Sequence, residues 1–448
     1  MSRYSQRSSC LAIGAILILL SLPIVSQSSM NLEYAIWSKA FGGRNYDTGE
    51  SIIEVEEGGF AVSGRTQGFE VLPHGDEAWL VRCDQNGNHL WNRTYGGGLE
   101  YGGFLSSFIH SVTVIESPDG GFLLTSHTTN YGPGDVNGWL IRTDQNGECL
   151  WNYTYGGGPD RVLIESTVCS QGGYLSVGYS ENTSEVSFDG WVLRTDANGN
   201  QLWNQTYGSP DIGELFCDVI EVNGGRFVIV GGLGEFSYFG DRSNSQQDGW
   251  LCCIDSDGSH LWNLSYGGHD VERLDQIIQC ENGDFAICGR TMSYGMGSLD
   301  TWLVRTDGNG HLLWNQTYGS EVIEVGFGLT ECHDGGFAIF TMSYDDAHAI
   351  SNGWFIRADS EGTPLWEHKY GGEDFDQFWG GVGLSDGFVA VGITQSFGAG
   401  MADMWITKIP EIRDPPKIDA GWVLITFGSS AAIIAILAIV LLKDKDSK

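Results

Sequence analysis

Short stretches of alternating apolar and polar residues fill the chain from residue 35 to residue 410, and glycine-rich turns separate them. The first complete set of such stretches covers residues 51–55, 60–65, 78–84 and 89–95. Alternation with a period of two is typical of β-strands that bury one face. Asn86-Gly87 joins the last two stretches, and Asn-Gly favours the positive φ angles that tight hairpins require. The pattern therefore predicts four short antiparallel strands.

This four-strand unit recurs along the chain. A phrase that begins at a tryptophan and ends in Tyr-Gly or Phe-Gly starts at Trp37, Trp91, Trp151, Trp203, Trp262, Trp314 and Trp366. A second tryptophan recurs inside each unit, at Trp79, Trp139, Trp191, Trp250, Trp302, Trp354 and Trp405. Four short strands repeated about every 50 residues are typical of a β-propeller. The repeats predict an all-β, seven-bladed propeller with four-stranded blades.

The two ends of the repeat region complement each other. The last unit ends after its third strand, at residues 406–409, and an orphan fourth strand precedes the first unit at residues 35–41. If the orphan strand completes the last blade, the ring has no unpaired edge, and unpaired edges promote aggregation. We therefore expect the N-terminal strand to close the ring.

Both ends of the chain are apolar. Arg3 and Arg7 precede an uncharged stretch at residues 11–25 and small residues at 26–29, an order typical of a secretory signal peptide. At the other end, residues 420–442 contain no charge and are long enough for a membrane-spanning helix. The expected organisation is a signal peptide (1–29), the propeller (30–410), a linker (411–419), a transmembrane helix (420–442) and a cytoplasmic tail (443–448). This predicts a single-pass protein of the cell membrane with an extracellular propeller.

Strand c, the third of each unit, runs toward the face of the a–b and c–d turns, so the chain would leave that face toward the membrane. The b–c and d–a connections are longer and belong to the opposite face, which we expect to point outward.

The charge of the chain limits its partners. Lys plus Arg number 23 against 57 Asp plus Glu, which gives a net charge of -34. Nucleic acid and anionic lipid surfaces attract basic patches, so neither is an expected partner. A solvated acidic surface and the binding of cations or of a basic partner remain as alternatives.

Nine cysteines follow the signal segment, and they form neither a close-spaced framework nor a zinc-binding pattern. Most of them are expected to be small buried strand residues, with one or two disulfides left open.

The hairpin between strands c and d carries an Asp, a turn Gly and a Trp, as in Asp144, Gly147 and Trp151. The other trios are Asp84, Gly87 and Trp91; Asp196, Gly199 and Trp203; Asp255, Gly258 and Trp262; Asp307, Gly310 and Trp314; Asp359, Gly362 and Trp366. At these residues the chain resembles the quinoprotein-like (PQQ-like repeat) propellers, and the resemblance implies that this Trp docks between blades. The Asp-to-Gly spacing is one residue shorter than in that family.

The quinoprotein dehydrogenases of that superfamily are typically eight-bladed, and they use a quinone, a calcium ion, a catalytic Asp and often a disulfide between adjacent cysteines. Cys252 and Cys253 are adjacent here, but they lie within a predicted strand, where neighbours point to opposite faces. A quinone-dependent dehydrogenase is therefore not expected.

Acids and aromatics of the longer loops are the candidate ligand-binding residues. They are Asp47, Asp76, Asp135, Asp160, Tyr238, Asp241, Asp270, Asp345 and Asp374. Aromatic side chains among carboxylates could hold a sugar, a calcium ion or a basic peptide. The alternative is ordinary loop polarity.

An acid or amide stands two residues before every strand-c Trp. The set is Glu77, Asn137, Asp189, Asp248, Asp300, Asn352 and Asp403. A side chain that hydrogen-bonds the preceding loop to the strand is one interpretation. The other is a ring of Ca²⁺ ligands near the axis, with Asp189, Asp248, Asp300 and Asp403 as candidates.

Six N-glycosylation sequons start at Asn92, Asn152, Asn182, Asn204, Asn263 and Asn315. Five of them share strand d, the predicted outer strand, where glycans could coat the rim. Repetition of the strand motif alone would also create them.

The first functional hypothesis is a cell-surface binding protein for an extracellular protein or glycan. A structural surface-layer component and a carbohydrate-active lyase or glycosidase are the alternatives, since propellers host many functions. The chain carries no HExxH, phosphate-loop or Ser-His-Asp signature, so binding is expected rather than catalysis.

Overall fold

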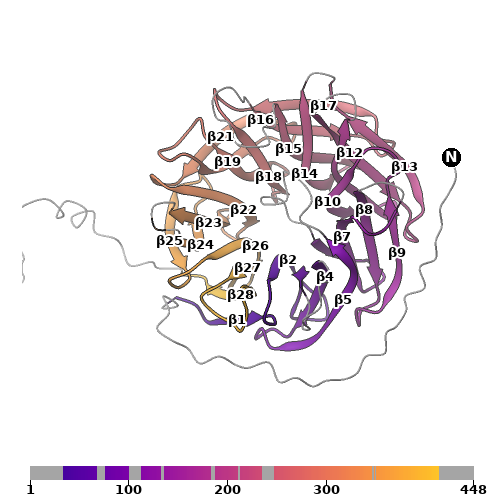
Figure 1. Cartoon of the computed structure of the whole chain (residues 1–448). Coiled ribbons are helices and arrows are strands. Elements are labelled where there is room, and N and C mark those ends of the chain that lie inside the picture. The colour runs from indigo at the N-terminus through magenta and orange to yellow at the C-terminus, as the bar shows by residue number, and fades with distance from the viewer. Residues whose placement is uncertain are drawn as a thin grey trace, which may run out of the picture. The chain divides into compact units, whose positions relative to one another are not determined.

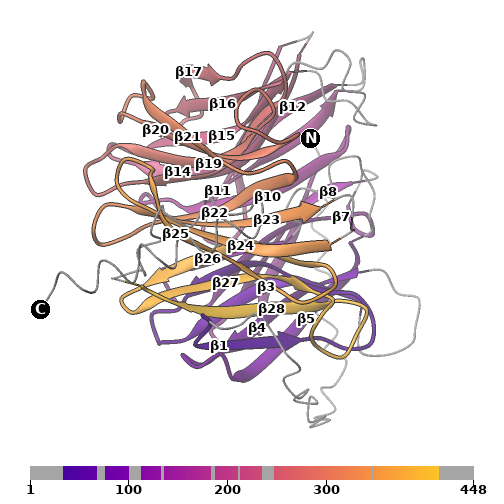
Figure 2. The same ribbon diagram turned by 90° about the vertical axis from the view of Figure 1, so that its left-hand side faces the viewer.

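The computed structural model describes residues 34–67, 76–99, 112–132, 136–182, 187–209, 212–234, 247–345, 348 and 350–412. These residues form seven four-stranded antiparallel sheets, arranged as blades around one axis (Figure 1). Seen from the side, the strands of every blade run from one face of the ring to the other (Figure 2). The predicted seven-bladed, all-β propeller is therefore confirmed.

Within a blade we name the strands a to d in chain order. Blade 1 comprises β2 (Asp47–Glu54), β3 (Phe60–Thr66), β4 (Asp76–Cys83) and β5 (His89–Leu99). Blade 2 comprises β6 (Val112–Glu116), β7 (Phe122–Thr128), β8 (Asn137–Thr143) and β9 (Cys149–Tyr155). Blade 3 comprises β10 (Arg161–Val168), β11 (Tyr174–Asn182), β12 (Ser187–Thr195) and β13 (Gln201–Tyr207). Blade 4 comprises β14 (Gly213–Val222), β15 (Arg226–Gly234), β16 (Gln247–Ile254) and β17 (His260–Tyr266).

Blade 5 comprises β18 (Glu272–Gln279), β19 (Phe285–Thr291), β20 (Asp300–Thr306) and β21 (Leu312–Tyr318). Blade 6 comprises β22 (Ile323–Glu331), β23 (Phe337–Asp345), β24 (Ile350–Ala358) and β25 (Pro364–Tyr370). Blade 7 comprises β26 (Asp376–Leu384), β27 (Gly387–Thr394), β28 (Asp403–Pro410) and the N-terminal strand β1 (Trp37–Phe41). Strand a is innermost in each blade and strand d is outermost (Figure 1).

The N-terminal strand closes the ring as the sequence predicts. It pairs antiparallel with β28, from Trp37 opposite Lys408 to Phe41 opposite Met404. Two side-chain hydrogen bonds fix this seam: the hydroxyls of Ser38 and Thr407 lie 3.1 Å apart, and Trp405 Nε1 donates to Ser38 Oγ at 2.7 Å. Every blade thus has four strands although one blade is built from both ends of the chain.

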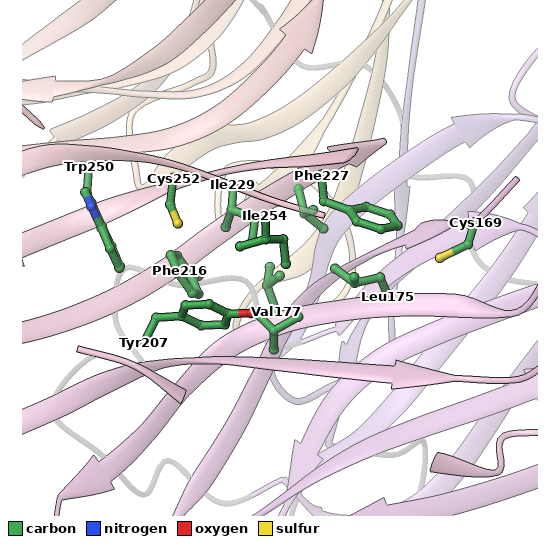
Figure 3. Close-up of a cluster of buried hydrophobic side chains, with 12 residues drawn as sticks. Cys169, Leu175, Val177, Tyr207, Phe216, Phe227, Ile229, Trp250, Cys252 and Ile254 are labelled. Atoms are coloured by element: carbon green, nitrogen blue, oxygen red, sulfur yellow. The ribbon is translucent and has the colours of Figure 1, made fainter. Parts of the chain in front are cut away.

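The hydrophobic core lies between neighbouring blades rather than inside one sheet. In the cluster of Figure 3, Tyr207 of blade 3 packs beside Phe216 and Trp250 of blade 4. The rings of Phe216 and Trp250 stack with centroids 4.7 Å apart and planes 12° from parallel. The same kind of cluster joins Tyr95 of blade 1 to Trp139 of blade 2. Blades therefore bury their apolar faces only when the ring is assembled.

A tryptophan of strand d lies over the turn glycine of the next blade. A Cβ atom built on Gly147 would come within 2.6 Å of the Trp91 ring, and Gly147 has a φ angle of 77°. The same arrangement pairs Trp37 with Gly87, Trp151 with Gly199, Trp203 with Gly258, Trp262 with Gly310, and Trp314 with Gly362. Glycine is required here for two reasons, the positive φ and the space for the indole. The inter-blade docking of this Trp, which the resemblance implies, is confirmed.

The Asp of each trio holds the turn in shape. Asp144 Oδ1 accepts hydrogen bonds from the backbone N–H groups of Asn146 and Glu148, both at 2.8 Å. Asp84, Asp196, Asp255, Asp307 and Asp359 make the same pair of bonds in their own turns. An Asp that caps backbone donors in this way favours one turn conformation. The Asp and Gly therefore shape a platform on which the neighbouring Trp docks.

The tyrosine that ends strand d adds a hydrogen bond to the same turn. Tyr155 Oη donates to the carbonyl oxygen of Gly199 at 2.6 Å, and Tyr95, Tyr207, Tyr266 and Tyr318 bond Gly147, Gly258, Gly310 and Gly362. Tyr370 of blade 6 occupies the same repeat position, but blade 7 has no c–d turn because its strands c and d come from opposite ends of the chain. Its buried hydroxyl accordingly has no partner among the described residues.

All nine cysteines after the signal segment are free thiols, so the one or two disulfides left open by the sequence do not form here. Seven of the nine are buried, as expected for small strand residues. Cys252 and Cys253 belong to different hydrophobic clusters, which confirms that they point to opposite faces of β16.

The predicted signal peptide (1–29), transmembrane helix (420–442) and cytoplasmic tail (443–448) lie outside the described residues, as does the linker beyond residue 412. No helix long and apolar enough to cross a bilayer occurs in the part of the chain that the structure describes.

The orphaned Tyr370 hydroxyl provides a matched control for the inter-blade hydrogen bond. Tyr155→Phe leaves the buried carbonyl of Gly199 without its donor, so we expect the free energy of unfolding to fall by about 1–3 kcal/mol. Tyr370→Phe removes a hydroxyl that bonds no described residue and should be close to neutral. Denaturant titration of the propeller region (residues 30–412) measures both. Equal losses in the two variants would contradict the role given to this hydrogen bond.

Candidate functional site

The two faces of the ring differ in what their side chains do. The a–b and c–d turns form the tight-turn face, where strand-c arginines hold the turns: Arg82 donates to the carbonyls of Gly58 at 2.6 Å and Cys83 at 2.7 Å. The b–c and d–a connections form the opposite face, which we call the long-loop face. Because the polar side chains of the tight-turn face mostly hydrogen-bond the backbone of that same face, the long-loop face is the candidate binding surface.

Two of the predicted ligand-binding acids are not loop residues. Asp47 begins β2 and Asp76 begins β4, and both are buried. Asp47 Oδ2 accepts a hydrogen bond from Gly43 N at 2.6 Å, and burial raises the pKa of this carboxyl group. Acids at the start of strand a do the same in other blades, as with Glu272 and Gly268 N at 2.9 Å. Asp47 is thus a repeated anchor of the d–a loop, a role that hydrophilic loop patterning does not reveal.

The remaining described acids of this set lie apart from one another, Asp345 at the end of β23 and Asp160, Asp270 and Asp374 in loops. Asp160 accepts a hydrogen bond from Val136 N at 2.9 Å, and Asp345 pairs with His348 Nδ1 at 2.7 Å. Asp270 and Asp374 are exposed. Asp135, Tyr238 and Asp241 lie outside the described residues. The structure therefore does not gather the described ones into one set, and none of the described residues form a group of three or more potential metal ligands.

The acids before the strand-c Trp connect loops to strands, which was one of their two interpretations. Asp403 Oδ2 accepts backbone hydrogen bonds from Ala399 at 3.0 Å and Gly400 at 3.1 Å, and Asp300 Oδ2 accepts one from Gly297 at 3.0 Å. Strand c is third from the axis in every blade. Asp189, Asp248, Asp300 and Asp403 therefore do not lie on the innermost strands, and their role as Ca²⁺ ligands stays a prediction.

These acids approach the strand-a acids of the next blade across one glycine. A Cβ atom on Gly267 would lie 2.1 Å from Asp248 Oδ1 and 2.8 Å from Glu272 Oε2. Gly42 and Gly208 occupy the same place between Asp403 and Asp47, and between Asp189 and Glu214. In these three Tyr-Gly or Phe-Gly phrases the glycine therefore makes room for two carboxyl groups. Burial, together with the charge of Asp47, raises the pKa of Asp403 to about 6.

A charged cluster lies on the inner strands of blades 1 and 2. Arg65 Nε contacts Glu50 Oε1 at 2.7 Å, and Arg65 Nη1 lies 3.5 Å from Asp76 Oδ2. Glu50 Oε2 also accepts a hydrogen bond from Val112 N of blade 2 at 2.9 Å. His127 of β7 lies within reach of both charges. Burial, together with the charge of Arg65, lowers the pKa of His127 to about 4. The buried Nδ1 of His127 has no partner among the described residues.

A second cluster lies on the inner strands of blade 5. Arg290 donates two hydrogen bonds of 3.0 Å to Asp275, from Nε and Nη2. Arg273 Nε donates to the same carboxylate at 2.8 Å. Phe327 of blade 6 lies under the Arg290 guanidinium, 5.2 Å from ring centroid to Cζ. Both arginines are 6% exposed. Two guanidinium groups thus share one carboxylate in a protein whose overall charge is strongly negative.

Glu165 and Asp218 form a carboxyl pair between these clusters, on the innermost strands of blades 3 and 4. Both side chains are half-buried, and the protein around them desolvates their carboxyl groups. Burial raises both pKa values, and the charge of Asp218 raises that of Glu165 further. Asp218 also accepts a hydrogen bond from Ile277 N of blade 5 at 2.9 Å. The pair therefore retains a proton near neutral pH and links blades 4 and 5.

Sequence reasoning missed these axial residues because they are exceptions to the repeat. Strand a carries a β-bulge in blades 1, 3, 4, 5, 6 and 7, and a bulge re-aims side chains next to it. The bulged positions hold Glu50, Ile164, Cys217, Asp275, Phe327 and Trp379. A charge in one copy where other copies are apolar is the signal that would have found them.

No protein-family model matches the chain, and no curated protein matches it. The resemblance to quinoprotein-like repeats therefore stays an interpretation of the repeat itself. Among solved structures, the WD40 propeller domain of Doa1 aligns with a TM-score of 0.49 at 11% identity, over 85% of this chain and 97% of that one. Puromycin hydrolase aligns with a TM-score of 0.47 at 13% identity, over 83% of this chain and 54% of that one. The propeller domain of the Trilobed protease from Pyrococcus furiosus aligns with a TM-score of 0.43 at 10% identity, over 86% and 99%. At these scores the likenesses carry no information on the activity of this chain.

The Glu165–Asp218 pair predicts how stability depends on pH. A carboxyl group whose pKa is raised in the folded state stabilises the fold below its unfolded pKa and loses that contribution as pH rises through the folded pKa. Glu165→Gln removes one titrating group and supplies a permanent donor toward Asp218. We expect the melting temperature of the propeller region (residues 30–412) to fall less between pH 5 and pH 8.5 in this variant than in the wild type. Glu54→Gln, at an exposed position of β2, is the control, and identical pH profiles for Glu165→Gln and wild type would contradict the assignment.

Proposed function

We propose that this protein is a membrane-anchored cell-surface propeller that binds an extracellular protein or glycan through its long-loop face, around the axial charges of blades 1, 2 and 5. The observation that carries the proposal is the presence of buried charges at inner positions where other blades hold apolar residues. Arg65 and Arg290, for example, occupy the strand-b position that is Met342 in blade 6 and Ile393 in blade 7.

The repeated scaffold does not depend on charges at the axis. The repeated residues (the strand-d Trp, the turn Asp and Gly, the terminal Tyr) already hold neighbouring blades together without any charge at the axis. A buried ion pair is commonly no more stable than apolar residues of the same volume, because desolvation offsets the attraction. Residues that break the repeat pattern without a compensating gain in stability are typical of functional sites. The axial charges are therefore better explained by a ligand than by the ring.

The connection to the membrane supports the orientation. β1 begins and β28 ends at the tight-turn face, and nine residues (411–419) separate β28 from the predicted span. With both terminal segments on one side, a membrane anchor would leave the long-loop face pointing away from the bilayer.

A carbohydrate lyase is the second candidate, and His127 is the observation that favours it. A histidine that stays neutral and has a buried Nδ1 without a partner can act as a general base. Arg65 beside it could hold the carboxylate of a uronic acid. Release of an unsaturated product from uronic-acid polysaccharides, lost in His127→Gln, would move the assignment from binding to catalysis.

Thermal unfolding of the ectodomain with a ligand panel tests the proposal. The panel contains Ca²⁺, Mg²⁺, neutral oligosaccharides, uronic-acid oligosaccharides and a basic peptide. A ligand present at about 100 times its Kd stabilises the folded state by about 2.7 kcal/mol, which raises the melting temperature by several degrees. We expect such a shift with a member of the panel, and its loss in Arg290→Gln.

Lys39→Gln on the outer strand β1 is the matched control and should keep the shift. A shift that survives Arg290→Gln and Arg65→Gln would place the ligand elsewhere and contradict the axial site. No shift with any member of the panel would contradict a small-ligand site.

A further inference from the structure

The outer rim carries a ring of exposed aliphatic side chains. The residue before each strand-d Trp is Leu or Ile, and all seven are between 45% and 59% exposed. They are Ile36, Leu90, Leu150, Leu202, Leu261, Leu313 and Leu365, which we call the rim leucines. Single exposed apolar residues are ordinary, but seven at one repeat position are not scattered. Something on the rim therefore requires, or covers, an apolar group at this place.

In five blades the same strand presents a sequon asparagine two residues later. Leu313 and Asn315 are an example, and side chains two residues apart lie on one face of a strand, roughly 7 Å from each other. Trp302 Nε1 donates to Asn315 Oδ1 at 3.1 Å, and Trp191 Nε1 donates to Asn204 Oδ1 at 3.5 Å. The amide is thereby fixed by its oxygen, and Asn315 is itself exposed. The nitrogen is the atom to which a glycan is attached, and Leu313 lies on the same face of the strand as Asn315.

The hydrogen bond to Trp does not explain the whole sequon. Blade 7 makes the same bond from Trp405 with a serine, Ser38, in place of the asparagine. Nothing in that bond needs a hydroxyl residue two positions further on. Yet the Ser or Thr accompanies every one of the five asparagines, as Thr94, Thr154, Thr206, Ser265 and Thr317. In blades 6 and 7 both the asparagine and the hydroxyl residue are absent. The two positions hold Glu367 and Lys369 in blade 6, and Ser38 and Ala40 in blade 7.

We infer that the five outer-strand asparagines carry N-linked glycans whose first sugar packs its apolar C–H face on the rim leucine two residues before it. The inference rests on the proposed surface location, because N-glycans are added to secreted chains. Covering a leucine removes apolar surface from water at about 25 cal/mol per Å². The glycans would coat blades 1 to 5 and leave the adjoining rims of blades 6 and 7 bare.

The test is a double-mutant cycle in blade 5, with the ectodomain secreted from a host that adds N-glycans. Thr317→Ala removes the sequon but keeps Asn315 and its bond to Trp302. Leu313→Ser removes the rim leucine. We expect peptide mapping to find Asn315 occupied, and Leu313→Ser to lower the melting temperature only when Thr317 is present. Trimming the glycan to one sugar should preserve this coupling.

Leu365→Ser in blade 6 is the matched control, because Glu367 stands where the asparagine would be. It should leave the melting temperature unchanged in both backgrounds. An unoccupied Asn315, or an occupied one with additive effects of the two substitutions, would overturn the inference. Light scattering could also show a dimer, or the protein could bind phosphatidylcholine vesicles. If Leu313→Ser abolished either, the inference would be overturned, because the rim leucines would then contact a second copy or lipid.

Occupancy in the secreting host tests the sites independently of the proposed function. If the native protein is not at the cell surface, its asparagines stay bare there although the secreted ectodomain is modified. That combination would count against the proposed function and not against the packing of sugar on leucine.

Discussion

The packing of one tryptophan on one glycine of the next blade is the contact on which the ring depends. A blade cannot bury its apolar faces alone, so its stability comes from its neighbours. The indole of Trp91 fits over Gly147 because that residue has no side chain and a positive φ, and Asp144 holds the turn that presents it. Tyr95 adds a hydrogen bond to the carbonyl of the same glycine. Six junctions share the Trp–Gly packing, and five of them also have the Tyr hydrogen bond, since Phe41 replaces the Tyr in blade 7. The junction from blade 6 to blade 7 lacks both because blade 7 has no c–d turn.

This design separates scaffold from function. Residues that repeat in the blades build the contacts between blades, the turns and the loop anchors, including acids such as Asp47 and Asp403 that hydrophilicity alone would assign to a binding surface. Residues that differ from blade to blade lie outside this shared framework, although Glu50 and Asp218 also accept hydrogen bonds from backbone N–H groups of the next blade. The charges at Arg65 and Arg290 are of this second kind. The proposed binding site follows from that contrast. The inferred glycan coat follows from repeated sequons and rim leucines that the contacts between blades do not require.

Much of the fold could be predicted from the sequence, because the determinants are local and repeated. The Trp phrases give the number of blades, and the orphan strand at residues 35–41 gives the closure. The site could be predicted less well. Asp47 and Asp76 were placed in loops because a buried acid at a strand start has the same sequence pattern as a loop acid. Glu50, Glu165 and Asp218 were missed because β-bulges and the convergence of inner strands bring together residues far apart in sequence.

The proposed outward orientation of the long-loop face is tested most directly by one labelling measurement. Met296 lies in the b–c loop of blade 5 and is 77% exposed, whereas Ser447 belongs to the predicted cytoplasmic tail. Met296→Cys and Ser447→Cys are each expressed in the full chain and treated with a membrane-impermeant maleimide, with the wild type giving the background of the native thiols. We predict labelling of Met296→Cys on intact cells and of Ser447→Cys only after the membrane is opened. Labelling of Met296→Cys that requires opened membranes would contradict the account.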